Sequence, residues 1–531
     1  MRRGNAAERL KHGVSLFIAL AVAGCLDELR ESPPEIVIGH QAPHRSLITD
    51  ALLTLDLHGK GFGGLVRIEE GNRLLAYFTH GLGEADLTFK TCLHPVSVWP
   101  DPTYAGGPLV RCPEDTPGFV SAEPFILHQF VSAQAAGDLN LDGFEDAVFA
   151  VLGRIEDPRI MVPLAAPCIL QGAGEWEMVF CPGTTLFSGI YVLIADGQGG
   201  FDPEASRFYA LPVAKPDPTG EFPNALPGVI RAIDSIEVAS PDGTSTKDLV
   251  LAVDLIFSIF GTPKDILPLA DGALVVFEND GKGRFTPGAR GELNASPASV
   301  AALELPTPPD AGGGGVLKLL LVCAVATHDG NLPVLTGNLL VVEAATLKVI
   351  RRHRLGAGFL PNQCAVGDVT GDSLPDVVAA DAHHIMVVSL RNPRREVPYL
   401  ALVPDDPSAT ALEEPEKDNV RRKITIRDLA VGELDANPSR AEIAVTADAG
   451  SLVLAYAFDP IRGLSKPARL GKPGSVDGSV LLALGHLNEP EETVIETVTP
   501  PPLDLAVTEN GSEGKGLFWL LLNTSHLAGR N

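Results

Sequence analysis

Short apolar runs, separated by turns rich in glycine, aspartate and proline, are the dominant pattern along this chain. Two clear examples are GIYVLIADGQGGFDP, which begins at Gly189, and GALVVFENDGKGRFTP, which begins at Gly272. Each run has the length of a β-strand, and the glycine-rich stretch after it is typical of a hairpin turn. The periodicity of amphipathic helices is nearly absent. The pattern therefore predicts an all-β protein.

Acidic and amide side chains at alternate positions mark one of these turns. The stretch GDLNLDGFEDAVFA places Asp138, Asn140 and Asp142 at positions 1, 3 and 5 of a loop, with Asp146 at position 9. Oxygen ligands in this pattern are typical of calcium loops. An EF-hand is excluded, because its position 12 would be Phe149 and because the following AVFAVL predicts a strand. The alternative is an Asp/Asn-rich hairpin turn without a metal.

A second loop, far along the chain, repeats the same plan. VGDVTGDSLPDVVAA places Asp368, Thr370, Asp372 and Asp376 at positions 1, 3, 5 and 9 before an apolar run. Alignment of loops and following strands gives seven units, lengthened by insertions at 93–125, 153–188 and 400–422. Their loops are marked by Asp56; Asp138; Glu237 and Asp248; Glu304; Asp368; Glu433, Asp435, Asn437 and Glu442; and His486 to Asp504. Seven units of two strand pairs predict a seven-bladed β-propeller, in which each blade buries its faces against its neighbours.

The two intact loops resemble the FG-GAP/VCBS repeat, the unit of integrin-alpha-type β-propellers. The resemblance implies a propeller with calcium in both loops, and with calcium acting as a structural brace. The implied ligands are the side chains of Asp138, Asn140, Asp142 and Asp146 with the carbonyl of Phe144, and those of Asp368, Thr370, Asp372 and Asp376 with the carbonyl of Leu374. Thr370 and Ser373 depart from the repeat pattern, so the second site is expected to be weaker. His58 and Lys60 replace ligands in the first unit, and the spacing has slipped in the sixth.

The ring of blades needs a strand that the last unit does not supply. After FWLLLN only a few residues remain, too few for the outer strand of the seventh blade. The apolar segment EIVIG, Glu35–Gly39, belongs to no unit. We expect it to complete the seventh blade, so that the propeller spans residues 35–531. The alternative is that this segment is part of a disordered tether.

The N-terminus predicts export and lipid attachment. A basic stretch precedes the apolar residues 14–23, which are too few to span a bilayer as a stable anchor. The junction Val-Ala-Gly-Cys resembles a bacterial lipobox, which implies a signal peptide over residues 1–24, a lipid on Cys25 and a tether over 25–34. Leu26, by resemblance to enterobacterial sorting, favours the outer membrane, facing the periplasm or the cell surface. The alternative is an ordinary secretory signal with a chance cysteine.

Charge and cysteine content narrow the class of protein further. The formal net charge of −26 argues against nucleic acid or anionic lipid as a partner. In an exported protein the cysteines are possible disulfides, and the short loops they would close pair Cys92 with Cys112 and Cys168 with Cys181. Cys323 and Cys364 remain, as buried thiols or as a third bridge.

Two classes of function fit these observations. The sequence holds no Gly-x-Ser-x-Gly, His-Glu-x-x-His or phosphate-loop motif, and His383 and His384 alternate across a strand. A binding, adhesion or scaffold protein with a protein or glycan ligand is the preferred interpretation, with contacts through the long insertions. The alternative is a calcium-dependent polysaccharide lyase or another propeller hydrolase, which the low aromatic content disfavours.

Overall fold

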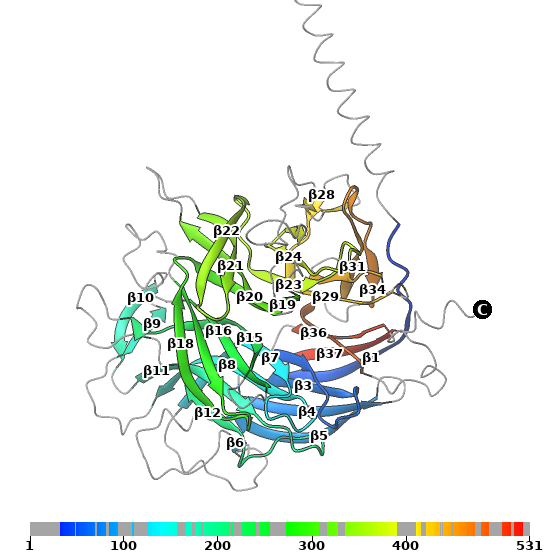
Figure 1. Cartoon of the computed structure of the whole chain (residues 1–531). Helices are drawn as coiled ribbons and strands as arrows, with labels where there is room; N and C mark the ends of the chain where they lie inside the picture. The colour runs from blue at the N-terminus through cyan, green and yellow to red at the C-terminus, as the bar shows by residue number, and fades with distance from the viewer. Residues whose placement is uncertain are drawn as a thin grey trace, which may run out of the picture.

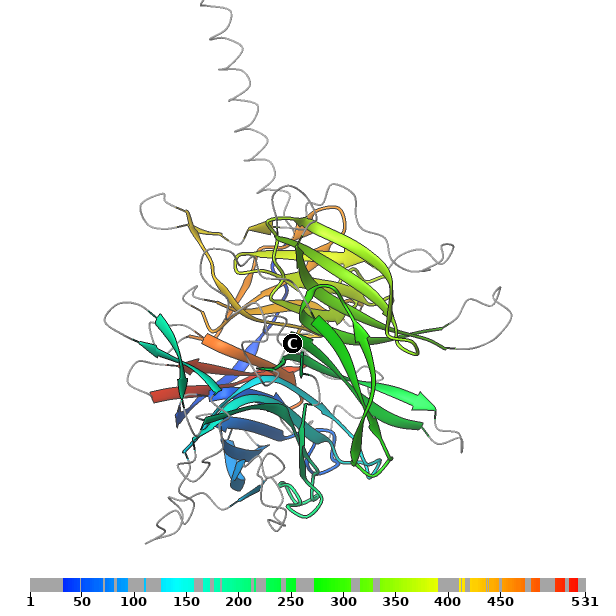
Figure 2. The same ribbon diagram turned by 90° about the vertical axis from the view of Figure 1, so that its left-hand side faces the viewer.

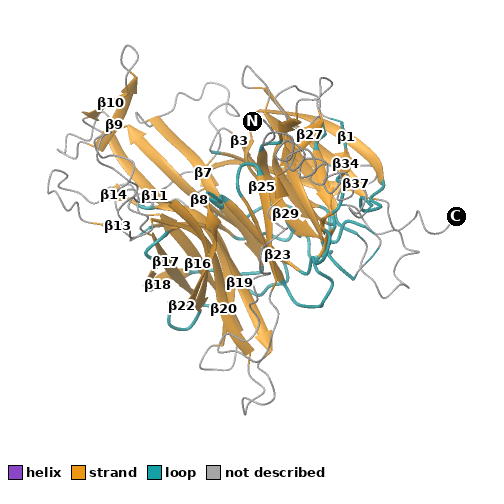
Figure 3. Ribbon diagram, turned by 90° about the horizontal axis from the view of Figure 1, so that it is seen from above, coloured by secondary structure: helices purple, strands orange, loops and turns teal. Residues whose placement is uncertain are grey.

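The computed structural model describes residues 32–47, 49–69, 72–80, 84–93, 109–110, 126–156, 166–171, 176–181, 184–211, 214–215, 226–239, 245–254, 272–306, 316–327, 335–389, 410–411, 413–415, 421–435, 437, 439–447, 451–472, 479–487, 502–510 and 515–523. The expected signal peptide, Cys25 and most of the expected tether lie outside these ranges. Within them every regular element is a β-strand (Figure 3). A search of the same ranges finds no helix long and apolar enough to cross a bilayer.

Seven antiparallel sheets form the blades, and the strands of each blade run in order from the centre of the ring outward. The first blade contains β2 (Thr49–Thr54), β3 (Gly64–Glu69), β4 (Arg73–His80), β5 (Glu84–Leu93) and β6 (Leu109–Val110). The second contains β7 (Ile126–Gly137), β8 (Asp146–Glu156), β11 (Thr184–Leu193) and β12 (Arg207–Ala210). The third contains β15 (Val229–Ala239), β16 (Ser245–Asp254), β17 (Gly272–Asn279) and β18 (Phe285–Glu292). The fourth contains β19 (Ser296–Pro306), β20 (Val316–Thr327), β21 (Leu335–Glu343) and β22 (Lys348–Ala357).

The remaining three blades follow the same plan. The fifth contains β23 (Gln363–Gly367), β24 (Asp376–Ala380), β25 (His384–Ser389) and β26 (Thr410–Ala411). The sixth contains β29 (Ile426–Gly432), β30 (Glu442–Ala447), β31 (Val453–Tyr456) and β34 (Ala468–Leu470). The seventh contains β35 (Ser479–Gly485), β36 (Asp504–Asn510), β37 (Lys515–Asn523) and β1 (Ile38–Leu47). Four small hairpins lie apart from these sheets: β9 (Ala166–Gln171) with β10 (Trp176–Cys181), β13 (Ala214–Lys215) with β14 (Leu226–Pro227), β27 (Glu413–Pro415) with β28 (Arg421–Lys423), and β32 (Phe458–Asp459) with β33 (Gly463–Leu464).

The innermost strands close a ring. They contact one another in the cyclic order β2, β7, β15, β19, β23, β29, β35 and back to β2, and the sheets surround a common centre (Figure 1). The predicted seven-bladed β-propeller is thereby confirmed. Every blade boundary falls between the units that the repeated loops define in the sequence.

Seven hydrophobic clusters fill the seven interfaces between neighbouring blades. Strand β8 shows how one strand serves two of them. Phe149 and Val151 pack toward the first blade, whereas Val148 and Ala150 pack toward the third. Successive side chains of a strand point to opposite faces, and here both faces are covered. This is why the strand is a continuous apolar run in the sequence rather than an alternating one.

The strand that closes the ring differs from the expected segment. The outer strand of the seventh blade is β1, Ile38–Leu47, which pairs antiparallel with β37 and shares only Ile38 and Gly39 with the expected segment 35–39. Figure 2 shows this N-terminal strand in blue beside the red C-terminal strands. Ile36 and Ile38 pack into the cluster between the sixth and seventh blades. The strand continues through polar residues beyond Ile38. An edge strand accepts such residues because only one of its two edges is paired with another strand.

Side chains of the inner strands also join neighbouring blades through hydrogen bonds. Gln134 of the second blade donates its amide to the carbonyl of Leu52 in the first and accepts from the N–H of Leu52 at 3.1 Å. Asp234 of the third blade accepts from the N–H of Ala302 in the fourth at 2.6 Å. These bonds satisfy backbone groups that face the centre of the ring.

Asp428 forms a similar link among three blades. It accepts hydrogen bonds from the N–H of Leu482 in the seventh blade at 2.8 Å and from the side-chain amide of Gln363 in the fifth at 3.2 Å. Burial raises the pKa of Asp428 to about 6, although the backbone N–H donors of Leu482 and Leu429 act in the opposite direction.

This raised pKa predicts a pH dependence of stability. The folded protein binds a proton at Asp428 more tightly than the unfolded chain, in which the carboxyl has its ordinary pKa of 3.8. The contribution is therefore fully present below pH 3.8 and is lost as the pH rises to about 6. Asp428 thus adds at most about 3 kcal/mol to the unfolding free energy. The actual contribution is smaller than this limit because Asp428 keeps some solvent contact. We expect Asp428→Asn to flatten the change of unfolding free energy across this pH window in urea titrations. A variant with the wild-type slope would show that Asp428 does not titrate there.

Candidate functional site

The loops singled out in the second and fifth units connect the first two strands of their blades. In the second blade Asp138 accepts hydrogen bonds from the N–H groups of Asp142 at 3.1 Å and Gly143 at 3.0 Å. In the fifth blade Asp368 accepts the equivalent bonds, from the residues four and five positions further along, at 3.1 and 2.6 Å. In both loops the leading aspartate therefore organises the turn.

The first blade carries the same turn without the implied ligands. Asp56 accepts from the N–H groups of Lys60 at 3.0 Å and Gly61 at 2.5 Å. Positions 4 and 6 of each loop have a left-handed backbone with φ between 63° and 89°: Gly59 and Gly61, Leu141 and Gly143, Gly371 and Ser373. Because the first loop keeps this form with His58 and Lys60 at ligand positions, the turn alone does not identify a metal site.

The donor set of the second-blade loop fits calcium in its chemistry. Asp138, Asn140 and Asp142 bring carboxylate and amide oxygens to one turn, and the amide of Asn140 lies 2.7 Å from a carboxylate oxygen of Asp142. These are the hard oxygen ligands that calcium prefers. Within the described ranges, no three His, Cys, Asp or Glu side chains form a group that could hold a metal. The amide of Asn140 and the carbonyl of Phe144 would thus have to complete the set.

The carboxylates at position 9 have a structural role that the sequence pattern does not assign. Asp146 is fully buried, and its two oxygens accept from the N–H groups of Leu139 at 2.9 Å and Ala195 at 2.8 Å. It therefore ties the loop to the end of the third strand. Burial raises the pKa of Asp146 to about 7, and the nearby Asp142 and Asp138 add to the effect. Each oxygen keeps a second lone pair with which it could also bind a cation.

The same brace recurs where the metal pattern is absent. In the seventh blade Asp504 accepts from the N–H groups of Leu487 at 2.9 Å and Asn523 at 2.7 Å. Glu442 in the sixth blade shares only part of this arrangement, because one of its oxygens accepts from the N–H of Leu434 at 2.8 Å and the other has no hydrogen-bond partner among the described residues. The signal was present in the sequence, because an acidic residue stands immediately before or within the start of the second strand in five units: Asp146, Asp248, Asp376, Glu442 and Asp504.

The predicted cysteine pairs have different outcomes. Cys323 on β20 and Cys364 on β23 form a disulfide with Cα atoms 6.4 Å apart, which joins the fourth and fifth blades. Cys92 is disulfide-bonded, and its expected partner Cys112 lies outside the described residues. Cys168 and Cys181 lie on the paired strands β9 and β10, and their pairing stays a prediction.

The two adjacent histidines have separate partners. His384 lies 3.0 Å from the carboxylate of Asp381, and His383 lies 3.0 Å from the carbonyl of Ile424. They do not form a common metal site.

No protein-family model matches this chain, and no curated protein matches it either. Among solved structures, it is similar to the crystal structure of the exotype rhamnogalacturonan lyase YesX. The two are 11% identical in sequence, with a TM-score of 0.37, and the match covers 92% of this chain and 75% of that one. This likeness carries no information on substrate or activity. The FG-GAP/VCBS assignment rests on the sequence motifs and stays a prediction.

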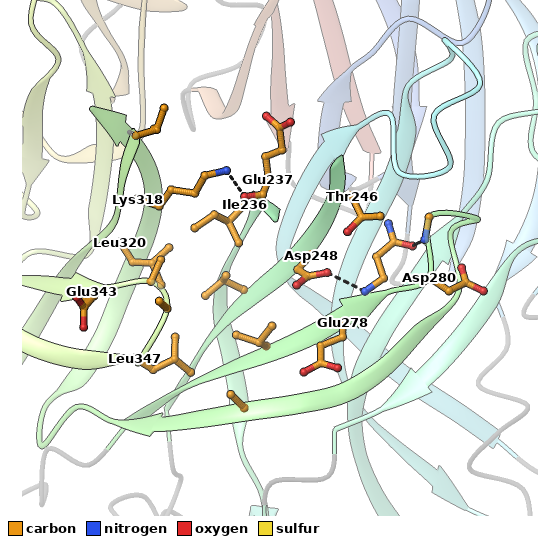
Figure 4. Close-up of a pocket in the computed structure, with 18 of the residues that line it drawn as sticks. Ile236, Glu237, Thr246, Asp248, Glu278, Asp280, Lys318, Leu320, Glu343 and Leu347 are labelled. Atoms are coloured by element: carbon orange, nitrogen blue, oxygen red, sulfur yellow. Dashed lines mark hydrogen bonds between the residues drawn. The ribbon is translucent and has the colours of Figure 1, made fainter. Parts of the chain in front are cut away.

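A groove of ≈ 910 Å³ lies between the third and fourth blades (Figure 4). Its apolar lining comes from both blades and includes Ile236, Val250, Val276, Leu320 and Leu347. The acidic side chains that line it are Glu237, Asp248, Glu278, Asp280 and Glu343. Leu141 and Val316 also line it, with exposed fractions of 52% and 55%. Large apolar side chains left in solvent beside a concave surface are typical of a contact site.

The two blades that line the groove differ in the turn between their third and fourth strands. In the third blade the turn NDGKGRF places Gly281 and Gly283 in left-handed conformations and ends in the buried Phe285. This turn reaches the second blade, where Asn279 donates to the carbonyl of Leu139 at 2.7 Å. The fourth-blade turn EAATLK is shorter and closes on itself, with the N–H of Leu347 donating to the carbonyl of Glu343 at 2.8 Å and Thr346 donating to the carboxylate of Glu343 at 2.6 Å.

In the sequence, Glu237 and Asp248 serve only as markers of a decayed loop. The fourth unit has no glycine-rich turn like NDGKGRF of the third, and this difference was the available signal for the groove. Without knowledge of which blades are neighbours, that signal does not reveal a cavity.

Proposed function

We propose that this chain is an extracytoplasmic binding or scaffold protein, tethered to the outer membrane through Cys25, with the groove between the third and fourth blades as its binding site. The groove is the observation that carries the proposal. Its size and its combination of an apolar lining with polar groups are those of ligand sites in general. The ligand is a protein segment or a glycan.

Two further observations support an extracytoplasmic location. The Cys323–Cys364 bridge joins two blades, and bridges of this kind persist in oxidising compartments. The formal net charge of −26 keeps the protein soluble and away from anionic membrane surfaces. A lipid on Cys25 would then be the attachment to the membrane, with the propeller held outside it.

A blocked groove tests the binding role. Ala289 lines the groove from the exposed strand β18, so Ala289→Trp should fill the entrance and leave the core intact. Leu87→Trp on β5 of the first blade, 51% exposed, is the matched control. We expect at least one component of an outer-membrane extract to bind the wild type and the control, and to be lost on Ala289→Trp, in quantitative mass spectrometry of captured material. Capture of the same components by all three proteins would refute the groove as the binding site.

Calcium binding is the second part of the proposal. Asp138, Asn140, Asp142, Asp146 and the carbonyl of Phe144 would hold the ion, which neutralises the carboxylates of the loop. At a hundredfold excess over its dissociation constant, one calcium would stabilise the fold by about 2.7 kcal/mol. We expect Asp142→Ala to remove most of the calcium-dependent rise in melting temperature, and Asp372→Ala to remove less.

Thermal melts with calcium or with chelator, joined to titration calorimetry, measure this effect. Asp56→Ala in the first-blade loop is the control, because it breaks the same turn and should lower stability equally under both conditions. If the wild-type melt is the same in both and no heat of binding appears, the loops are turns without a metal.

Lipid attachment has its own test. Cys25→Ser should release the protein from membranes or leave an unprocessed precursor, since the substituted residue cannot form a thioether. Fractionation and intact mass of the wild type and variant measure both results. Unchanged membrane association with unchanged mass would overturn the anchor.

A further inference from the structure

We infer that the groove between the third and fourth blades selects a cationic ligand, an ammonium or guanidinium group carried on an apolar body, such as a lysine or arginine side chain within an apolar peptide segment. The inference rests on the proposed binding function and adds the chemistry of the ligand. The observation behind it is that acidic residues are distributed around the apolar lining of the groove.

Carboxylates surround the groove from both blades. Glu237, Glu278 and Asp280 belong to the third blade and Glu343 to the fourth, and Figure 4 shows them around the apolar side chains of Ile236, Leu320 and Leu347. Glu278 and Asp280 are exposed and line the groove, whereas the side chain of Glu237 alternates with that of Ile236 and so points to the other face of its strand. Charges of one sign over a low-dielectric surface strengthen the local field and attract the opposite charge.

Asp248 places a further carboxylate inside the groove. It is 7% exposed, and one of its oxygens accepts from the N–H of Asn279 at 2.8 Å. Burial raises the pKa of Asp248, and the neighbouring charge of Glu278 adds to the effect. A bound cation would relieve both costs, because an opposite charge favours the ionised carboxylate.

The two lysines of the groove do not balance these charges. Lys318 is held by Glu304, whose carboxylate lies 2.7 Å away and does not line the groove. It also donates to the backbone carbonyl of Glu237. Lys282 is exposed at the turn of the third blade, and five acidic residues belong to the same lining. The groove therefore keeps an excess of negative charge.

The apolar lining defines the other half of the ligand. Leu141 and Val316 leave about half of their surface in solvent at the groove, and Val276 is half-buried there. A small hydrated cation gains nothing from such a surface, whereas an apolar body covers it and releases water. The combination favours an amphipathic cation over a free metal ion.

Two probes that differ only in charge test this selection. Dansylcadaverine carries one ammonium on an apolar fluorophore, and its N-acetyl derivative is the neutral match. We expect the wild-type protein to enhance and blue-shift the fluorescence of dansylcadaverine, with at least tenfold weaker binding of the acetylated probe. Glu278→Gln and Asp280→Asn should each weaken the cationic probe several-fold and leave the neutral probe unchanged. Glu35→Gln, an exposed carboxylate at the seventh blade, is the charge-matched control and should change neither.

The outcomes separate this inference from the proposed function. Equal binding of both probes, abolished by Ala289→Trp, would overturn the charge selection and leave the groove as a binding site. Binding of the cationic probe that survives Ala289→Trp, or that falls equally with Glu35→Gln, would show general attraction to an acidic protein and overturn the inference. Failure of both probes to bind would count against the inference and against the groove itself.

Discussion

Replacement of the closing strand β1 by a ten-residue Gly/Ser segment is expected to lower the unfolding free energy by about 5 kcal/mol. The substituted segment would forfeit the antiparallel ladder along β37, in which each hydrogen bond contributes roughly 1 kcal/mol net. It would also lose the packing of Ile38 and the stacking of His44 on Phe518, whose ring centroids lie 4.6 Å apart.

The loss should appear as a melting temperature lower by about 5–10 °C in differential scanning fluorimetry. The uncovered edge of β37 should also promote association, because an unpaired strand edge is a template for another chain. Size-exclusion chromatography measures that effect. A Gly/Ser replacement of the nine residues 26–34 is the control of similar length and should melt like the wild type. If both replacements behave alike, β1 does not close the ring.

Removal of the Cys323–Cys364 disulfide is the second change with a large expected effect. The two cysteines are 41 residues apart in the sequence. Without the cross-link the unfolded chain gains conformational entropy, which lowers the unfolding free energy by about 4 kcal/mol in the chain-entropy account. The joint variant Cys323→Ala/Cys364→Ala should therefore unfold at lower denaturant concentration than the wild type.

Reduction provides the control for that experiment. Dithiothreitol should lower the stability of the wild type by a similar amount. It should lower the stability of the variant by less, and that decrease would come from the remaining disulfides, such as that of Cys92. A variant as stable as the oxidised wild type would show that blade packing alone fixes the fourth and fifth blades. Cys323 is 1% exposed, so alanine keeps the site apolar and limits the cavity that remains.

The repeated pattern of loop, apolar run and glycine-rich turn was sufficient to predict the architecture. Each unit contains its own strand and turn signals, and a blade with two apolar faces requires neighbours on both sides. The sequence also located the loops at Asp138 and Asp368. In each loop the leading aspartate accepts hydrogen bonds from N–H groups no more than five residues further along the chain. Properties that depend on neighbours in the chain were therefore accessible from the sequence alone.

Properties that depend on neighbours in space were decided only by the tertiary structure. β1 extends to Leu47 because β37 offers a free edge, although half of its own residues are polar. The bridge between Cys323 and Cys364 depends on contact between two consecutive blades. The sequence predicts Asp146 as a metal ligand, and only the fold shows that its oxygens also accept from N–H groups on either side of the hairpin. The groove, finally, arises where a short turn of the fourth blade faces the third, and a cavity is a property of two surfaces that no single segment encodes.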